Sequence, residues 1–165
     1  MRNEPAVLAV SGVKNSGKTT LIQRILSGLA DAGLYVAVIK HDGHSFQADP
    51  PETDTGRYFE AGAFAAAVFD GEKFKHIERR PVTETELIQQ FPQADLILLE
   101  GFKQSSWPKL EVVRKGNSEV SVCDPGTLLA LVTDSDLSID GVPVIKPDDT
   151  EGVVRRILQF VKEER

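Results

Sequence analysis

Long apolar runs are missing from this sequence, and cysteine is almost absent. No stretch approaches the roughly 20 apolar residues that a membrane-spanning helix needs. Residues 1–5 show no basic segment followed by an apolar one, so we expect no secretory leader. The single cysteine, Cys123, excludes an internal disulfide. These absences predict a cytoplasmic protein that does not act at a membrane.

An excess of positive charge is also missing. The sequence has 25 acidic and 19 basic residues, a net charge of −6. A surface that is acidic on average repels the phosphate backbone of nucleic acids. We therefore expect no nucleic-acid partner, and any anion that binds must be held by a local, preorganised site.

What is present is the composition of an ordinary globular domain. Hydrophobic residues make up 41% of the chain and charged residues 27%, which is far from the composition of disordered proteins. A chain of 165 residues is long enough to bury a substantial core. The sequence contains no linker, internal repeat or low-complexity stretch, so residues 1–165 are predicted to form a single domain.

Segments with strand spacing and segments with helix spacing alternate along this domain. The helix ends carry recognisable signals: a C-terminal glycine at Gly33, a Thr83 and Glu86 capping box, and Asp148 with Glu151 as the cap of the last helix. Strands are expected at 6–11, 34–40, 65–70, 74–79, 95–99, 109–114 and 128–133, and helices at 18–29, 53–61, 83–90 and 148–161.

A phosphate-binding motif follows the first expected strand. The pattern G-x-x-x-x-G-K-[ST] fits residues 12–19, between a predicted strand and a predicted helix, which is the context that this motif requires. The glycines let backbone N–H groups converge on phosphate oxygens, and the helix start adds the positive end of its dipole. The predicted nucleotide-binding residues are Gly12, Val13, Lys14, Asn15, Ser16, Gly17, Lys18, Thr19 and Thr20.

The motif and the alternating elements together predict the fold class. We expect an α/β protein of the P-loop NTPase type, with a mostly parallel sheet, helices on both faces of the sheet and one hairpin extension around Asp70-Gly71-Glu72. Lys18 is expected to contact the terminal phosphates and to act in catalysis. Thr19 is expected to bind Mg²⁺ through its hydroxyl.

An acidic residue follows the buried strand at 95–99. Open α/β sheets bind ligands at the carboxyl ends of their strands, which is where Glu100 and Gly101 lie. We predict that Glu100 holds magnesium or a magnesium-bound water, or positions the attacking water, and we assign it as a catalytic residue. Gly101 would allow close approach to the γ-phosphate.

The polar segment after the second strand has three open interpretations. In the first, Asp42 or Asp54 contacts Mg²⁺ or its waters. In the second, His41 and His44 bind a transition metal. The third is a polar loop without a ligand. Further cations are candidates for phosphate contact: Lys14, Lys40, Arg57, Lys103 and Lys109.

The sequence resembles the family of molybdopterin-guanine dinucleotide biosynthesis protein B, MobB. The resemblance extends over most of the chain. The segment Glu100-Gly101-Phe102-Lys103 followed by Pro108-Lys109-Leu110-Glu111 is more specific than the P-loop, which many families share. The other matching segments are residues 12–20, Ile39-Lys40-His41 and residues 54–63 with Glu60-Ala61-Gly62-Ala63.

The resemblance implies a GTP-binding, homodimeric protein with weak Mg²⁺-dependent GTPase activity. It also implies a MobA-like molybdenum cofactor guanylyltransferase as partner and contact with the molybdopterin cofactor. By matched position, Lys18 and Thr19 would bind phosphate and magnesium, and Glu100 would be the acidic strand-end residue. Asp54 would belong to the mobile loop, where we predict it as a metal ligand. No Asn-Lys-x-Asp sequence is present, and Thr133-Asp134 is only a partial analogue, so the preference for guanine rests on the resemblance.

A protein of a different class uses the same motif. A free-standing small-molecule kinase or ligase would phosphorylate or activate an acceptor, and a kinase needs a lid with arginines near the transferred phosphoryl group. The adjacent arginines Arg79 and Arg80 lie at the end of the expected hairpin and not in a clear lid. This placement favours the accessory GTPase.

Overall fold

The computed structural model describes residues 4–43, 46 and 49–164. The chain forms two compact units: Met1–His41 with Leu87–Arg165, and Asp42–Glu86, which is inserted into the first. The expectation of one domain over residues 1–165 stays a prediction, because compactness does not establish whether the two units fold independently. Within the described ranges, no helix has both the length and the apolar character that crossing a membrane requires.

The first unit is built on a parallel six-stranded sheet in the order β2-β5-β1-β6-β7-β8. Every strand pairs in parallel with its neighbours, which confirms the predicted α/β fold class. The strand β8 was not predicted, because two residues are too few to show a period. The strands are β1 (Ala6–Ser11), β2 (Val36–Lys40), β5 (Leu96–Glu100), β6 (Lys109–Val113), β7 (Leu128–Thr133) and β8 (Val144–Ile145).

The two faces of this sheet carry separate apolar layers. Side chains alternate between the faces along each strand, so Leu8 and Val10 belong to one core cluster and Val7 and Ala9 to the other. The helices α1 (Lys18–Asp31) and α4 (Thr150–Glu163) cover the first face. The second face is covered by α3 (Glu84–Gln89), through Leu87 and Ile88, and by Phe102 and Trp107. The predicted helices on both faces are therefore confirmed.

Two of the predicted helix-end signals are confirmed and one is wrong. Gly33 has φ +83 and follows the end of α1, and its N–H donates to the carbonyl of Ala30 at 2.8 Å. The N–H of Glu86 donates to Thr83 Oγ1 at 3.2 Å, and the Glu86 carboxylate accepts the Thr83 N–H at 2.9 Å, which is a capping box.

The cap of α4 is Asp149, not Asp148 with Glu151. The Asp149 carboxylate accepts the N–H of Gly152 at 2.8 Å. The sequence contains two consecutive aspartates, Asp148 and Asp149. The prediction chose Asp148 as the cap because Glu151 follows it at capping-box spacing. The backbone turns into the helix one residue further on, so the second aspartate supplies the cap.

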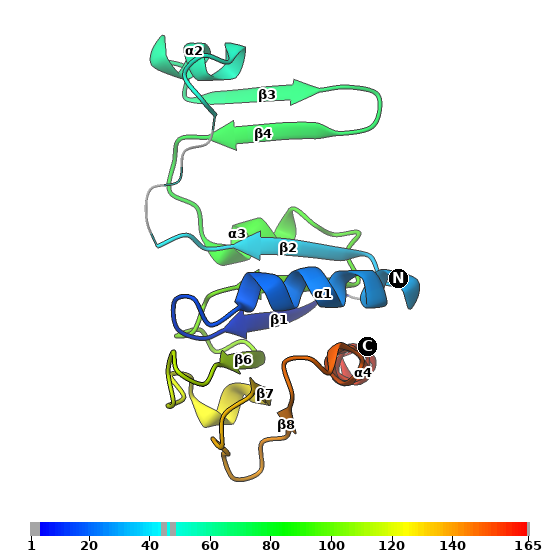
Figure 1. The fold of residues 1–165 in the computed structure, drawn as a ribbon. Coiled ribbons are helices and arrows are strands. Elements are labelled where there is room, and N and C mark those ends of the chain that lie inside the picture. Colours follow the sequence, from blue (N-terminus) through cyan, green and yellow to red (C-terminus); the bar gives the residue numbers. More distant parts are fainter. Residues whose placement is uncertain (1–3, 44–45, 47–48, 165) are drawn as a thin grey trace. The chain divides into compact units, whose positions relative to one another are not determined.

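The second unit contains α2 (Asp54–Glu60) and an antiparallel hairpin of β3 (Ala65–Phe69) and β4 (Phe74–Glu78) (Figure 1). Thr53 caps α2 by accepting the N–H of Gly56 at 3.1 Å. The hairpin was predicted, and its register places Phe69 opposite Phe74. A short 3-10 helix, η1 (Pro125–Thr127), precedes β7 in the first unit.

Candidate functional site

The strand order brings the predicted P-loop and Glu100 together. In the sheet β5 lies directly beside β1, and their register aligns Val10 with Glu100. Because parallel strands end at the same edge, the loop that leaves β1 after Ser11 starts next to the Glu100 side chain. Sequence reasoning assigned both segments to the carboxyl edge but did not place them on neighbouring strands.

The loop has a backbone that only certain residues tolerate. Gly12 has φ +139, and a Cβ atom added there would lie 2.4 Å from the carbonyl oxygen of Val112. Gly17 has φ +95 and Asn15 has φ +62, both in the left-handed region. The two motif glycines are therefore required by the conformation, and Gly12 also by close approach of backbone to backbone.

The start of α1 is open to an anion. Gly17 is the N-cap residue, and no side chain caps the helix or places an acidic group in its first turn. The first N–H groups of a helix have no partner within the helix and carry the positive end of its dipole. A phosphate group is the ligand that such a terminus favours, provided that cations support it.

Lys18 lies against the loop with its ammonium directed at the loop carbonyls. Its Nζ donates to the carbonyl oxygen of Val13 at 2.7 Å and to that of Gly12 at 3.3 Å. Burial lowers the pKa of Lys18, and the positive charges of Lys40 and Lys103 lower it further, whereas the Glu100 carboxylate raises it. Three cations thus gather at one edge of an acidic protein, and a bound phosphate would stabilise the charged form of Lys18.

Thr19 and Glu100 are in direct contact. The Thr19 hydroxyl donates to Glu100 Oε1 at 2.5 Å, and the same oxygen lies 3.3 Å from Lys40 Nζ. Glu100 is only 7% exposed. A hydroxyl and a carboxylate side by side fit Mg²⁺, which binds proteins through one or two oxygens and keeps several waters. In the described part of the chain, no three His, Cys, Asp or Glu residues form a metal cluster, so a site built from protein ligands alone is not indicated there.

Two buried serines border this arrangement. Ser11 donates through its hydroxyl to the Gly101 carbonyl at 2.5 Å, which ties the end of β1 to the segment after β5. Ser16 is fully buried, and among the described residues its Oγ has no hydrogen-bond partner. An unpaired polar atom in a phosphate-binding motif is consistent with a ligand that completes the site.

The other candidate cations differ in their burial and in what they contact. Lys40 and Lys103 act electrostatically on Lys18, as the pKa of that residue indicates. Lys109 is fully buried and donates to the carbonyls of Ser105 at 2.7 Å and Trp107 at 2.8 Å. Its ammonium therefore anchors the loop before β6, and the hypothesis that Lys109 contacts phosphate does not fit the structure.

Sequence reasoning did not select the polar turn after β6. Asn117 Nδ2 donates to the carbonyl oxygen of Lys14 at 3.1 Å, within the P-loop. Arg114 Nε donates to Asp134 at 2.9 Å, and the N–H of Lys115 donates to the other oxygen of Asp134 at 2.7 Å. The carboxylate considered as a partial analogue of a guanine-binding aspartate is thus held by protein donors. The only sequence signal was a polar run directly after a strand.

The polar loop after β2, which carries the candidate metal ligands, belongs mostly to the second unit. Asp54 is the first residue of α2, and its carboxylate lies 3.8 Å from Arg57 Nη1. Its assignment as a metal ligand stays a prediction. The His41 ring packs against Phe102 with 5.5 Å between the ring centroids, whereas His44 lies outside the described residues.

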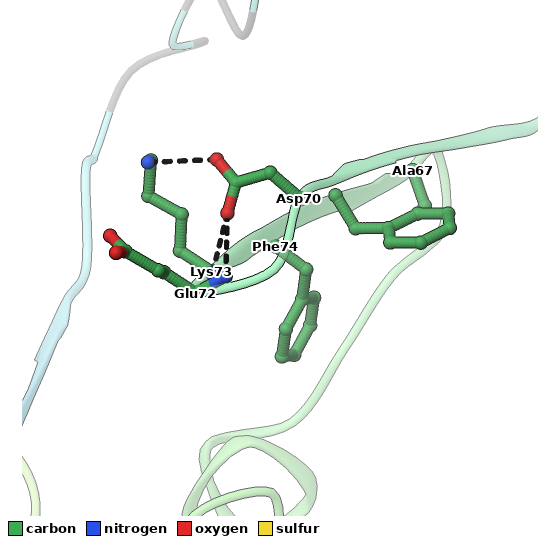
Figure 2. Close-up of a pocket in the computed structure, with 6 residues that line it drawn as sticks. Ala67, Asp70, Glu72, Lys73 and Phe74 are labelled. Atoms are coloured by element: carbon green, nitrogen blue, oxygen red, sulfur yellow. Dashed lines mark hydrogen bonds and ion pairs between the residues drawn. The ribbon is translucent and has the colours of Figure 1, made fainter.

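A surface hollow lies at the tip of the hairpin and not at the P-loop (Figure 2). Its turn is held by Asp70, whose Oδ1 accepts the N–H groups of Glu72 at 2.8 Å and Lys73 at 2.9 Å (Figure 2). Phe69 and Phe74 line this hollow. Asp70 is paired with Lys73 within the turn, and Ala67, Phe69 and Phe74 are apolar, so we assign this hollow no chemistry.

The fold and the site together define an α/β protein of the P-loop type. The defining features are the parallel sheet, the glycine-rich loop between β1 and α1, the lysine and threonine at the helix start, and the carboxylate on the adjacent strand. Residues 7–134 match the family described as "MobB: Molybdopterin guanine dinucleotide synthesis protein B". The chain therefore belongs to the MobB family.

Individual relatives agree with this membership. A Haemophilus influenzae protein named "Molybdopterin-guanine dinucleotide biosynthesis adapter protein" is 33% identical over 144 residues, covering 85% of this chain and 81% of the relative. An Escherichia coli protein of the same name is 29% identical and covers 96% and 94% of the two chains. The crystal structure of Bacillus subtilis MobB is similar with a TM-score of 0.77 and 30% identity, covering 94% and 97%.

Proposed function

We propose that this protein is a GTP-binding adapter that hydrolyses GTP slowly with Mg²⁺ and supports formation or delivery of the molybdopterin guanine dinucleotide cofactor. The observation that carries the proposal is the contact of Thr19 with Glu100 at 2.5 Å beside the Lys18 loop. A hydroxyl and a carboxylate in contact beside the start of α1 support a magnesium site next to the bound phosphates. The names of the relatives supply the pathway.

Each part of the site has a separate task in this proposal. The loop of residues 12–17 and the N-terminus of α1 bind the phosphates through backbone N–H groups. Lys18 neutralises the terminal phosphates. Thr19 and Glu100 would hold Mg²⁺ directly or through its waters, and the metal would neutralise charge on the phosphates when bound.

Slow hydrolysis follows from the same arrangement. The Glu100 carboxylate accepts a hydrogen bond from Thr19 and acts electrostatically on Lys18. Its Oε1 is shared between Thr19 and Lys40. A carboxylate that holds Mg²⁺ or its waters is poorly placed to accept a proton from the attacking water as a strong general base. We therefore expect weak GTPase activity and turnover that depends on a partner.

The proposed partners are a MobA-like guanylyltransferase, the molybdopterin cofactor and a second copy of this chain. The word "adapter" in the relatives' names supports a role through another protein. The homodimer is supported by the hairpin, because Phe69 is 83% and Phe74 is 78% exposed on a sheet of only two strands. An isolated hairpin is marginally stable in water, and a second copy would cover its apolar side chains.

Nucleotide titrations test the proposal. GTP should bind several-fold tighter than ATP in the presence of Mg²⁺, and phosphate release should be slow and independent of small acceptors. Equal affinities would remove the guanine preference. Phosphate transfer to an added acceptor would instead identify a kinase or ligase. A pull-down that recovers a guanylyltransferase or a molybdoenzyme precursor with the wild type, but not with Lys18→Ala, would support the adapter role.

A further inference from the structure

The turn after β6 runs beside the P-loop. β6 pairs in parallel with β1, and the register aligns Glu111 with Ser11, so the residues after Val113 leave the sheet at the same edge as the P-loop. The N–H of Asn117 donates to the Arg114 carbonyl at 3.0 Å and closes the turn. The Asn117 side chain then donates to the Lys14 carbonyl at 3.1 Å, which fixes the turn against the loop.

Asp134 holds the Arg114 guanidinium by one of its three nitrogens. Arg114 Nε donates to Asp134 Oδ2 at 2.9 Å, and the N–H of Lys115 holds Oδ1 at 2.7 Å. The Lys115 N–H and the Arg114 guanidinium hold the pKa of Asp134 below its ordinary value, so the carboxylate is charged at neutral pH. The terminal nitrogens Nη1 and Nη2 of Arg114 have no hydrogen-bond acceptor within the ranges that the structure describes.

One of these terminal nitrogens lies beside the P-loop. A Cβ atom added to Gly17 would be 3.7 Å from Arg114 Nη1. Gly17 is the N-cap of α1, where the unpaired N–H groups begin. The Arg114 side chain is 44% exposed, so its open end is accessible to a ligand.

We propose that Arg114 binds the phosphate chain of the nucleotide and that Asp134 is its positioning residue. The inference rests on the proposed function and extends it to residues outside the P-loop motif. A guanidinium that is fixed at Nε presents its terminal N–H groups as a preorganised fork, which suits phosphate oxygens. Lys18 and Arg114 would then contact the phosphates from two different elements, the start of α1 and the end of β6.

An ordinary surface ion pair is the competing explanation. Arg114 and Asp134 are both partly exposed, and such pairs contribute little to stability. That explanation accounts for the contact at Nε, but it gives no reason for the approach of Nη1 to Gly17 or for the Asn117 contact with the loop. The two explanations differ in what the loss of Arg114 does to phosphate binding.

Calorimetric titration of GTP with Mg²⁺ tests the proposal on the full chain. Arg114→Ala should weaken GTP binding about tenfold, as expected for a charge-assisted contact that is partly exposed, and Arg114→Lys should recover only part of the loss. Arg155→Ala is the matched control, because it removes an equally charged side chain from an exposed pair with Glu151 on α4. Melting temperatures of all variants should stay within about 3 °C of the wild type.

Inorganic tripolyphosphate identifies the part of the nucleotide that Arg114 contacts. Used as a competitor, it should show the same loss of affinity as GTP in Arg114→Ala. A loss with GTP but not with tripolyphosphate would assign Arg114 to the base or ribose and overturn the proposal.

The positioning role of Asp134 has its own readout. Asp134→Asn should reduce affinity in the wild-type background but add no further loss in Arg114→Ala, because its effect passes through the guanidinium. Equal losses in both backgrounds would overturn this role.

The outcomes also separate this inference from the proposed function. If the wild type binds GTP, Lys18→Ala weakens binding and Arg114→Ala does not, the Arg114 assignment is wrong and the proposed function stands. If the folded wild type binds no nucleoside triphosphate, both fail.

Discussion

The substitution Glu100→Gln tests the central pair of the proposed site. Glu100 is almost fully buried, and its Oε1 accepts the Thr19 hydroxyl at 2.5 Å and lies 3.3 Å from Lys40 Nζ. Glutamine has the same size and retains an oxygen that accepts from Thr19, so the change removes the charge and little else. Loss of the ion pair with Lys40 should cost little stability, because the Lys40 side chain is 55% exposed and can be solvated.

The expected effect is large on turnover and small on binding and stability. Loss of a positioned charge at the metal side should lower the rate of GTP hydrolysis by roughly ten- to a thousandfold. GTP affinity at neutral pH should change little, because the backbone N–H groups and Lys18 still contact the phosphates. Stability should fall by no more than about 1 kcal/mol, the value of a partly exposed ion pair.

The pH dependence of binding gives a second readout of the same change. Burial lowers the pKa of Lys18 below its ordinary value, and the charge of Glu100 opposes this effect. Removing that charge should lower the pKa of Lys18 further. Since phosphate binding favours the protonated lysine, GTP affinity should decrease as the pH rises through the pKa of Lys18 in the free protein. In Glu100→Gln this decrease should begin at a lower pH than in the wild type.

Calorimetry between pH 7 and about 10 and phosphate release at neutral pH measure these effects in parallel. Glu151→Gln on α4 is the control, because it removes the same charge from a side chain that is 91% exposed. Hydrolysis by Glu100→Gln at the wild-type rate would show that Glu100 is a structural strand-end carboxylate. An unshifted pH profile would refute the electrostatic coupling of Glu100 to Lys18, even if the rate falls.

Further substitutions at the loop, the helix start and the hairpin give distinct expectations. Lys18→Ala should weaken GTP binding with or without metal, whereas Thr19→Ala should weaken it mainly when Mg²⁺ is present, and titrations with and without chelator distinguish the two. Gly12→Ala should destabilise the fold by about 3 kcal/mol in denaturant unfolding, because its Cβ would meet the Val112 carbonyl at 2.4 Å. Gly141→Ala, where φ is +74 and no atom is near, should cost only about 1 kcal/mol, and equal losses would refute the steric argument. Phe74→Asp should convert the proposed homodimer to a monomer in light scattering without loss of GTP binding. An unchanged mass would show that Phe74 is not part of the dimer interface.

The sequence by itself determined the local elements and the identity of the phosphate-binding loop. The strand β1, the hairpin and the capping box of α3 were predicted because period, turn residues and short-range hydrogen bonds are encoded within a few neighbouring positions. Gly12, Lys18 and Thr19 could be assigned for the same reason, since their spacing within one loop is itself the motif.

The tertiary structure decided which distant segments share an edge of the sheet. The insertion of β5 between β2 and β1 brings Glu100 to Thr19, and the pairing of β6 with β1 brings Arg114 to Gly17. It also showed that Lys109 is buried, although the sequence presents it as one more cation. Strand order depends on how the helices and the two apolar faces pack across the whole chain, so no local spacing encodes these contacts.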